Sequence, residues 1–563
     1  MVLPDWIFRK CTSAALASLF LLFSLSLLTP ACAQPEIAAP PPSPSASHPA
    51  GPNATLRPEP SNTPSPPPKY FLDPSLPVNL RNLIALPNHY QITDQRRQAD
   101  LVVSTGSGEL IGRWYYALVA PFPSLQESIS LEELVMFWQA PADVSSLQPP
   151  LHLSQETKEA LSLLWGDPAP DAVRVSSSDR DILDLLWPDP TASALIPLDR
   201  LSPRWKVISI DGVSPLEPGN LGEYSLYLPI RLSGSAHLLK EELPSLTNFN
   251  PEQLTTVAVT GVTALVRDTA SIMEERGISY PAGDVGTLLR EADITHISNE
   301  VPFASDCPDP DPTQTSLYFC SRDEYIQLLE AVGTDVVELS GDHFGDWGPE
   351  AMLHTLEMYH RKGWLTYGGG KTLQEGLQPV FIAHNGNQIA FIGCNGKGLD
   401  RYATASETNP GAAGCDFDWM EQEIRRLADQ GFLVIATMQH EEIDSFTPVA
   451  WQLRDFRRLA DAGAVIVSGS QAHHPQTMEF YQSAFIHYGL GNLFFDQHYL
   501  ANYFPEKHIN KDKGFIDLHT FYDGAHINTN LVPIQFLDNA RPRPMTPQES
   551  RIFLEKVFSA ADW

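Results

Sequence analysis

The sequence predicts an α/β fold, and two features of the chain after about residue 250 support this prediction. Short apolar, β-rich runs alternate there with amphipathic helical patterns, and such alternation is typical of sheets flanked by helices. Glycine follows three of the predicted helices, at Gly363, Gly431 and Gly463, as expected at a helix C-terminus. The predicted strands are Thr255–Thr260, Asp335–Leu339, Gln388–Gly393, Leu433–Met438 and Ala464–Ser468, and the predicted helices are Asp323–Val332, Pro349–Arg361, Met420–Gln430 and Pro448–Ala462.

A smaller α/β domain is expected from residue 71 to residue 245, ahead of a larger one from residue 250 to residue 563. Its strand candidates are Trp114–Ala120 and Trp205–Ile210, with helical patterns between them at 130–137 and 178–186. The segments 117–138 and 193–212 resemble extracytoplasmic solute-binding proteins of the phosphate-binding type. That resemblance implies a ligand loop at Ser104–Gly108, although the same residues also suit an ordinary surface loop.

The amino terminus carries the pattern of a targeting segment. Two basic residues precede an uncharged, apolar run, Ala14–Leu28, which has the length of a signal-peptide core and is short for a membrane span. We therefore expect residues 1–33 to be a signal peptide. Its end has two interpretations, which are an A-x-A cleavage site ending at Ala33 and a lipobox in which Cys32 is lipidated. An uncleaved anchor helix is the remaining alternative.

Residues 34–70 are rich in proline, serine and alanine, a composition that forms neither helix nor sheet and buries no core. We expect a disordered, semi-extended linker that holds the folded part away from an anchor, and this favours the lipoprotein interpretation of Cys32. The chain is thus predicted to be exported, at the cell surface or the periplasmic face of the membrane. No later segment has an apolar run long enough to span a bilayer, so the N-terminal anchor is the expected membrane contact.

The charge of the chain excludes one class of partner. There are 37 Lys plus Arg against 68 Asp plus Glu, which makes the formal net charge −31, and no basic stripe occurs. Nucleic acids and anionic membrane surfaces need clustered cations, so neither is expected as the main partner. The sequence indicates no oligomeric state.

Four cysteines lie beyond the leader, at Cys307, Cys320, Cys394 and Cys415. They allow three pairings, and the two sequence-local pairs each close a loop rich in proline, aspartate, glycine or alanine. Such loops gain most from a disulfide in an oxidising compartment. Four reduced thiols are the alternative, and a zinc cluster is disfavoured because no CxxC spacing is present.

Polar residues follow four of the apolar segments of the larger domain at the point where each ends. In open α/β sheets, ligands bind beyond the carboxyl ends of the strands, so these four loops could converge on one site. Carboxylate, imidazole and amide groups are the ligands of divalent metals, and all three occur there. The loops are 298–300, 340–348, 439–442 and 469–475.

The larger domain resembles a known family over about Thr255 to Gln497. The resemblance rests on Gly341–Gly348 (GDHFGDWG), on Tyr367–Asn395, on Asp461–Phe480 (DAGAVIVSGSQAHHPQTMEF) and on Ile486–Gln497 (IHYGLGNLFFDQ). These segments resemble the capsule-synthesis CapA family, which is linked to poly-γ-glutamate. The resemblance implies a calcineurin-like metallophosphoesterase αββα sandwich, preceded by the smaller solute-binding-protein-like α/β domain.

The resemblance also implies a set of metal ligands. The family's acidic loop matches Glu300, and its Asn-His pair matches Asp342 and His343, where aspartate replaces the amide ligand. The paired histidines of the family fall on Gln471 and His473, so one imidazole has become an amide. His343 keeps the place of the general acid, and Asp346 keeps the place of the carboxylate that orients it. Further site candidates are Asn299, His440, Glu442, His474 and Asn492.

Two ligand positions of the family have no ligating residue in this chain. The opening Gly-Asp loop falls on Gly261 and Val262, and the histidine before Glu442 falls on Met438, with His440 displaced from that position. A two-metal phosphoesterase needs a bridging carboxylate and several nitrogen ligands. We therefore expect one divalent metal (Mn, Fe or Zn) rather than two, or a metal-free site.

Two functions remain open from the sequence. The first is an exported CapA-like protein that acts in capsule or poly-γ-glutamate-type polymer synthesis. If it is an enzyme, we expect metal-assisted hydrolysis in which His343 protonates the leaving group. The alternative is a non-catalytic cell-surface binding protein for a small anion or polymer fragment. Both functions make an anionic polymer or a small molecule the expected ligand.

Overall fold

The computed structural model describes one compact unit that runs from Pro68 to the C-terminal region. The leader, Cys32 and most of the proline-rich linker lie outside the described residues, so the predictions made for them stay predictions. Within the described part, no helix is long and apolar enough to cross a membrane. The residues described are 67–84, 90–141, 146–217, 219–234, 246–397, 403–497 and 510–561.

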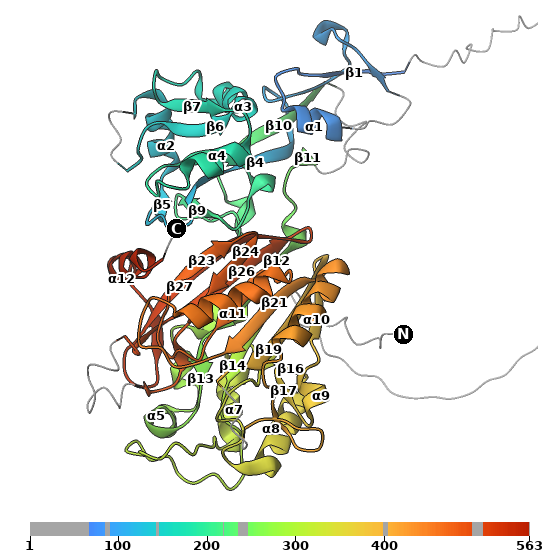
Figure 1. The fold of residues 1–563 in the computed structure, drawn as a ribbon. Helices are drawn as coiled ribbons and strands as arrows, with labels where there is room; N and C mark the ends of the chain where they lie inside the picture. Colours follow the sequence, from blue (N-terminus) through green and yellow to red (C-terminus); the bar gives the residue numbers. More distant parts are fainter. Residues whose placement is uncertain are drawn as a thin grey trace, which may run out of the picture. The chain divides into compact units, whose positions relative to one another are not determined.

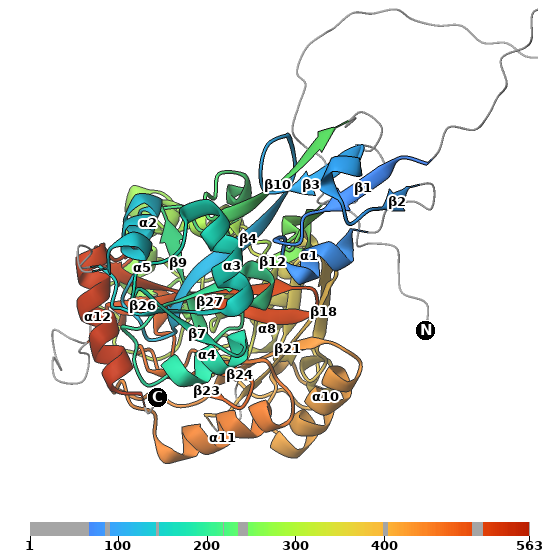
Figure 2. The same ribbon diagram turned by 90° about the horizontal axis from the view of Figure 1, so that it is seen from above.

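The predicted fold class is confirmed, because the described residues form mixed α/β sheets (Figures 1 and 2). The first sheet is built from residues 69–247 and has the order β2-β1-β3-β10-β4-β8-β6-β7, with β9 and β11 also pairing with β4 and β5 with β9. Figure 2 shows β10, β3, β1 and β2 side by side at one end of it. Its strands are β1 (Lys69–Leu72), β2 (Gln91–Ile92), β3 (Leu101–Ser104), β4 (Glu109–Pro121), β5 (Ser128–Ile129), β6 (Leu151–Ser154), β7 (Val173–Ser176), β8 (Ala194–Pro197), β9 (Trp205–Ile210), β10 (Tyr227–Gly234) and β11 (Leu246–Thr247).

Serine caps explain where three helices of this region begin. The hydroxyl groups of Ser130, Ser154 and Ser178 each accept a hydrogen bond from the backbone N–H three residues later, which satisfies a donor at the start of a helix. Both strands and both helices predicted here are confirmed, although β4 is longer than expected. The helices are α1 (Val78–Leu83), α2 (Leu131–Gln139), α3 (Gln155–Trp165) and α4 (Asp179–Leu186).

The rest of the chain forms two larger sheets. One has the order β16-β15-β14-β12-β26-β27-β28, with β13 and β25 joined to it through β14, and the other has the order β18-β19-β21-β22-β24-β23. A further pair, β17 with β20, is separate. The strands are β12 (Leu254–Thr260), β13 (Val262–Thr263), β14 (Ile294–Asn299), β15 (Val336–Glu338), β16 (Leu365–Tyr367), β17 (Gly369–Gly370), β18 (Val380–His384), β19 (Asn387–Asn395), β20 (Gly411–Ala412), β21 (Leu433–Gln439), β22 (Ile466–Gly469), β23 (Met478–Tyr481), β24 (Ala484–His487), β25 (Asn492–Phe494), β26 (Lys513–Tyr522), β27 (Ala525–Phe536) and β28 (Pro542–Pro544).

The two sheets pack face to face between layers of helices. An apolar cluster that includes Val257, Tyr367 and Phe391 fills the space between them. Helices α7 and α8 pack on the outer face of the sheet that contains β12, and α10 and α11 cover the outer face of the sheet that contains β21 (Figure 1). The four layers make an αββα sandwich. Its helices are α5 (Arg267–Arg276), α6 (Gly286–Glu291), α7 (Ile326–Ala331), α8 (Gly348–Lys362), α9 (Leu373–Gly376), α10 (Phe417–Asp429), α11 (Ala450–Asp461) and α12 (Pro547–Ser559).

The predicted elements of the sandwich are present, with small shifts at their ends. Gly363, Gly431 and Gly463 all have positive φ angles, as the prediction of helix termini requires. The helix predicted at 323–332 is a 3₁₀ turn, Asp323–Tyr325, followed by α7. Asp416 accepts a hydrogen bond from the backbone N–H of Trp419, so α10 begins three residues earlier than the apolar pattern indicates.

Both sequence-local disulfides form. Cys307 is bonded to Cys320, and Cys394 to Cys415, with Cα atoms 5.8 and 5.0 Å apart. The first disulfide closes a loop beyond β14, and the second joins the end of β19 to the segment before α10. Both lie at the carboxyl ends of strands, where the polar loops were expected to meet.

Candidate functional site

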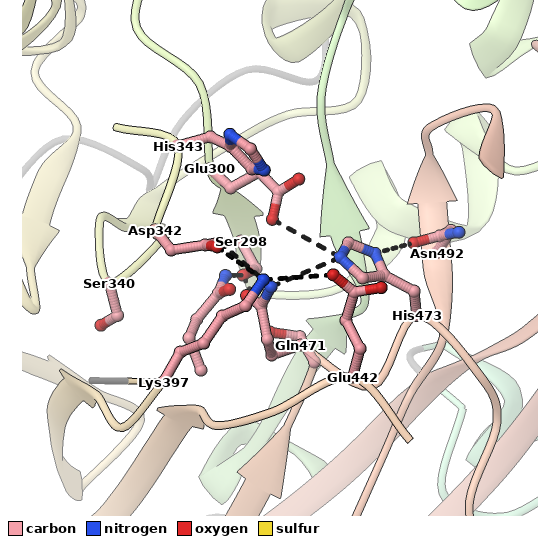
Figure 3. A network of polar contacts seen from close by, with 12 residues as sticks. Ser298, Glu300, Ser340, Asp342, His343, Lys397, Glu442, Gln471, His473 and Asn492 are labelled. Carbon is pink, nitrogen blue, oxygen red and sulfur yellow. Dashed lines mark hydrogen bonds and ion pairs between the residues drawn. The ribbon is translucent and has the colours of Figure 1, made fainter. Parts of the chain in front are cut away.

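Polar loops from both sheets of the sandwich converge at one place (Figure 3). β12, β14, β15 and β16 are parallel in one sheet, and β19, β21 and β22 are parallel in the other, so their carboxyl ends can meet. The structure brings together the predicted residues Glu300 after β14, Asp342 and His343 after β15, Glu442 after β21, Gln471 and His473 after β22, and Asn492 at the start of β25.

A glycine allows two of these loops to approach each other. A Cβ atom added at Gly341 would lie 2.4 Å from both Cα and Cβ of Glu300. Only glycine therefore fits between the Glu300 loop and the Asp342 loop without moving the backbone. The residue before Asp342 thus determines how closely the first two acidic groups of the site can pack.

Glu300 is the most deeply buried acid of the site. Its side chain is 0% exposed, and within the described part of the chain neither carboxyl oxygen has a hydrogen-bond partner. The nearest nitrogen of His473, Nε2, lies 3.9 Å from Oε2. Burial raises the pKa of Glu300 to about 8, with the charge of His343 opposing the shift and that of Asp342 adding to it.

His343 and Asp346 form a closely held pair beside Glu300. Nδ1 of His343 donates a hydrogen bond of 2.8 Å to Oδ2 of Asp346, and the backbone N–H of Phe319 donates to the same oxygen at 2.9 Å. The Phe319 ring packs edge-on against the imidazole. Burial lowers the pKa of His343, but the hydrogen bond to Asp346 and the charges of Glu300 and Asp342 outweigh it and raise the pKa to about 9.

His473 is neutral and fixed in one orientation. Its Nδ1 lies 2.7 Å from Oδ1 of Asn492, so Nδ1 carries the proton and donates a hydrogen bond to the amide oxygen. Nε2 then carries a lone pair that accepts a hydrogen bond from Nε2 of Gln471 at 3.5 Å, and it lies 3.9 Å from Oε2 of Glu300. Burial lowers the pKa of His473 to about 4. The residue also has a φ of 50°, an uncommon backbone conformation that the tight turn after β22 imposes.

Two lysines complete the site, and the sequence analysis did not identify either. Nζ of Lys397 lies 2.6 Å from Oδ2 of Asp342 and 3.1 Å from Oε1 of Glu442 (Figure 3). Nζ of Lys511, a side chain only 2% exposed, lies 3.2 Å from Asp444 and 3.7 Å from Glu442. Burial raises the pKa of Glu442, but the positive charges of the neighbouring Lys397 and Lys511 outweigh it and lower the pKa to about 2.

Lys397 could have been found from the sequence, because it follows β19 just as the predicted loops follow their strands. A charged lysine has no lone pair for a metal, so a pattern of metal ligands does not include it. Lys511 stands before β26, which is antiparallel to β12, and carried no such signal.

Three of the predicted candidates point elsewhere. His440 donates from Nε2 to Asp455 at 3.0 Å and stacks on Trp451. Nδ1 of His474 is bound to the carbonyl oxygen of Pro475 at 2.7 Å. The Asn299 amide group donates to the backbone of Val301 and to Tyr359. The hydrogen bonds of all three side chains thus go to groups outside the cluster.

Residues 256–497 match a family model described as "Bacterial capsule synthesis protein PGA_cap". The C-terminal half resembles the CapA family. The chain is 23% identical over 297 residues to "Capsule biosynthesis protein CapA" of Bacillus anthracis, covering 52% of this chain and 69% of that protein. It is 25% identical over 267 residues to "PGA biosynthesis protein CapA" of Bacillus subtilis (strain 168), covering 46% and 67%. The αββα sandwich is the calcineurin-like metallophosphoesterase fold that this resemblance implies.

Solved structures also resemble parts of the CapA-like chain. A putative 5'-nucleotidase from Staphylococcus aureus matches 54% of this chain and 58% of its own, with 9% identity and a TM-score of 0.32. A phosphate transport receptor from Vibrio cholerae matches 30% of this chain and 87% of its own, with 12% identity and a TM-score of 0.25. These TM-scores are too low for any inference about the function of this chain.

The residues of the CapA-like site do not fit a pair of metal ions. Among the described residues, no group of three or more His, Cys, Asp or Glu side chains is placed to hold a metal. Val262 packs in an apolar cluster with Val301 and Phe495, and Met438 lies in the core beneath α10 and α11. The partnerless oxygens of Glu300 would suit a metal, but Asp342 and Glu442 are already paired with an ammonium group.

Proposed function

We propose that this chain is an exported protein that takes part in the synthesis of capsule or of a poly-γ-glutamate-type polymer. The two relatives named above support the polymer, since one is named for capsule and the other for PGA biosynthesis. Both disulfides support export, because such bonds persist in oxidising compartments. The signal-peptide pattern and the proline-rich linker of the sequence agree with an anchored protein outside the cytoplasm.

We further propose that the site binds an anionic group of the polymer, a carboxylate or a phosphate. The observation that carries this proposal is that the partly exposed donors of the site are cations. The side chains of His343 and Lys397 are 17% and 29% exposed, whereas Glu300 and His473 behind them are buried. Asp346 keeps His343 protonated, so its second N–H can donate a charge-assisted hydrogen bond to an anion.

Calorimetric titration of the full chain with short poly-γ-glutamate chains tests this binding. We expect saturable binding to the wild type, and a loss of about tenfold or more in affinity for His343→Gln, because one hydrogen bond to a charged group is removed. His354→Gln is the matched control, since His354 is a histidine on α8, 34% exposed, that pairs with Asp323 outside the site. Failure of the wild type to bind, or equal losses in both variants, would refute the proposal.

Cleavage of the polymer is a second candidate, and the His343–Asp346 pair favours it. A protonated imidazole held by a carboxylate can protonate a leaving group, which is the role of a general acid. The test is the release of new amine or phosphate ends when polymer is incubated with wild type and with His343→Gln. Release that depends on His343 would support an acid-catalysed hydrolase, and binding without release would leave a binding protein.

A further inference from the structure

Lys397 occupies the position between two acidic side chains that would otherwise be available to a cation. Its ammonium group lies within 3.1 Å of one carboxylate oxygen on each of Asp342 and Glu442. The two acids come from different sheets of the sandwich, Asp342 after β15 and Glu442 after β21. Lys397 comes from a third strand end, after β19, and it is the group that joins them (Figure 3).

The second oxygen of each of these acids also has a partner. Nε2 of Gln471 donates to the other oxygen of Asp342 at 3.1 Å, so both oxygens of that carboxylate accept from the chain itself. The other oxygen of Glu442 faces the ammonium group of Lys511 at 3.7 Å. Lysine has three donors and no lone pair when charged, so neither ammonium can share a metal with these carboxylates.

A divalent ion placed between Asp342 and Glu442 would meet the Lys397 ammonium at contact distance. Like charges at that separation repel strongly where water is partly excluded, and the side chain of Asp342 is only 15% exposed. One of the two charges has to leave. The ammonium group is covalently held, so its local concentration is fixed, whereas a metal has to bind from solution.

We propose that Lys397 is a built-in cation which replaces the metal of this fold, and that its presence excludes a divalent ion from the Asp342–Glu442 pair. The ammonium group keeps the two acidic loops together, as a bridging metal would. The site therefore keeps its shape and its cationic centre without any bound metal. Removal of the charge, with the apolar stem retained, opens the two carboxylates to Mn²⁺ or Zn²⁺.

The experiment compares the full-length wild type with Lys397→Met, using Mn²⁺ alone as the probe. We expect no stoichiometric Mn²⁺ on the wild type after equilibrium dialysis and no change in its melting temperature when Mn²⁺ is added. Lys397→Met should melt at a lower temperature in chelator, because two neighbouring acids lose their counter-ion. Mn²⁺ should then bind and raise that melting temperature by a few degrees.

Two further variants make the result specific. Lys371→Met removes an exposed lysine and should behave as the wild type. Lys397→Met combined with Asp342→Asn removes one of the two carboxylates that lose their ammonium partner, and it should abolish the Mn²⁺ response. A folded Lys397→Met that gains no Mn²⁺ would overturn the proposal.

The wild-type measurement needs no variant, so the proposal can fail even where Lys397→Met does not fold. Stoichiometric Mn²⁺ on the wild type, with a raised melting temperature, would overturn it. These readouts use no polymer, so they separate a failure of this inference from a failure of the binding function proposed above.

Discussion

His343 owes its charge to one neighbour more than to its surroundings. Burial alone would lower its pKa, and the hydrogen bond to Asp346 is the first of the interactions that reverse this effect. Asp346→Asn keeps the shape of the partner and removes its charge. We expect the pKa of His343 to fall from about 9 by about one unit or more, because an opposite charge at this distance shifts a pKa by about 1–3 units.

A titration of ¹³C-labelled histidine followed by NMR measures this change directly. Asp323→Asn is the control, since Asp323 pairs with another histidine, His354. A His343 pKa that stays the same in Asp346→Asn would mean that Glu300 and Asp342 hold the proton instead.

The sequence could predict the acids and imidazoles of the site because each directly follows a strand. Glu300, Asp342 and His473 lie together as that rule requires, although their roles stay predictions. The rule cannot tell which way a side chain turns, and His440 shows this, because it follows β21 and yet binds Asp455. The ion pair of Lys397 with Asp342 joins two loops from different sheets, so no local sequence pattern predicts it.

At the scale of elements, the loop that contains the first disulfide contacts the His343–Asp346 pair and helps to hold it in place. Cys307 and Cys320 are 13 residues apart, and Phe319 next to Cys320 supplies both the N–H that binds Asp346 and the ring that covers His343. Strand and helix positions were predictable from apolar periodicity. The contact between this loop and Asp346 was not, because the loop has almost no periodic pattern of its own.

Replacement of both cysteines, Cys307→Ala with Cys320→Ala, should lower the free energy of unfolding by about 3 kcal/mol, since the disulfide no longer restricts a short loop in the unfolded chain. Urea titration measures this loss. The control is Cys394→Ala with Cys415→Ala, which removes the second disulfide, between cysteines 21 residues apart. Both pairs should lose stability, but only the first should shift the NMR signals of His343. Equal effects on His343 would show that the first loop does not position it.

At the scale of the whole molecule, a buried polar chain joins the two sheets of the sandwich. Nε2 of His296 on β14 lies 2.8 Å from the hydroxyl of Tyr367 on β16, which lies 2.9 Å from Thr437 on β21. Thr437 donates in turn to Glu338 on β15 at 2.8 Å. These groups are among the buried polar residues between the sheets, where a broken link would leave an unpaired polar atom at a substantial cost.

His296 makes the stability of this sandwich depend on pH. Burial lowers its pKa from the usual 6.5 to about 3, so the unfolded chain binds a proton there more readily than the folded chain. The stability that neutral His296 contributes is fully present above pH 6.5 and is lost as the pH falls toward 3. The loss amounts to about 2 kcal/mol between pH 7 and pH 5.

His296→Phe removes the titrating group and keeps a ring that can stack on Phe391. The difference in unfolding free energy between wild type and variant, measured in urea, should therefore shift in favour of the variant as the pH falls from 7 to 5. Glu300, whose pKa is raised to about 8, changes stability in the opposite sense over an overlapping range, but it is present in both proteins and cancels in the difference. A difference that does not change with pH would show that His296 has the same pKa in the folded and unfolded chain, which would contradict its burial as a neutral group.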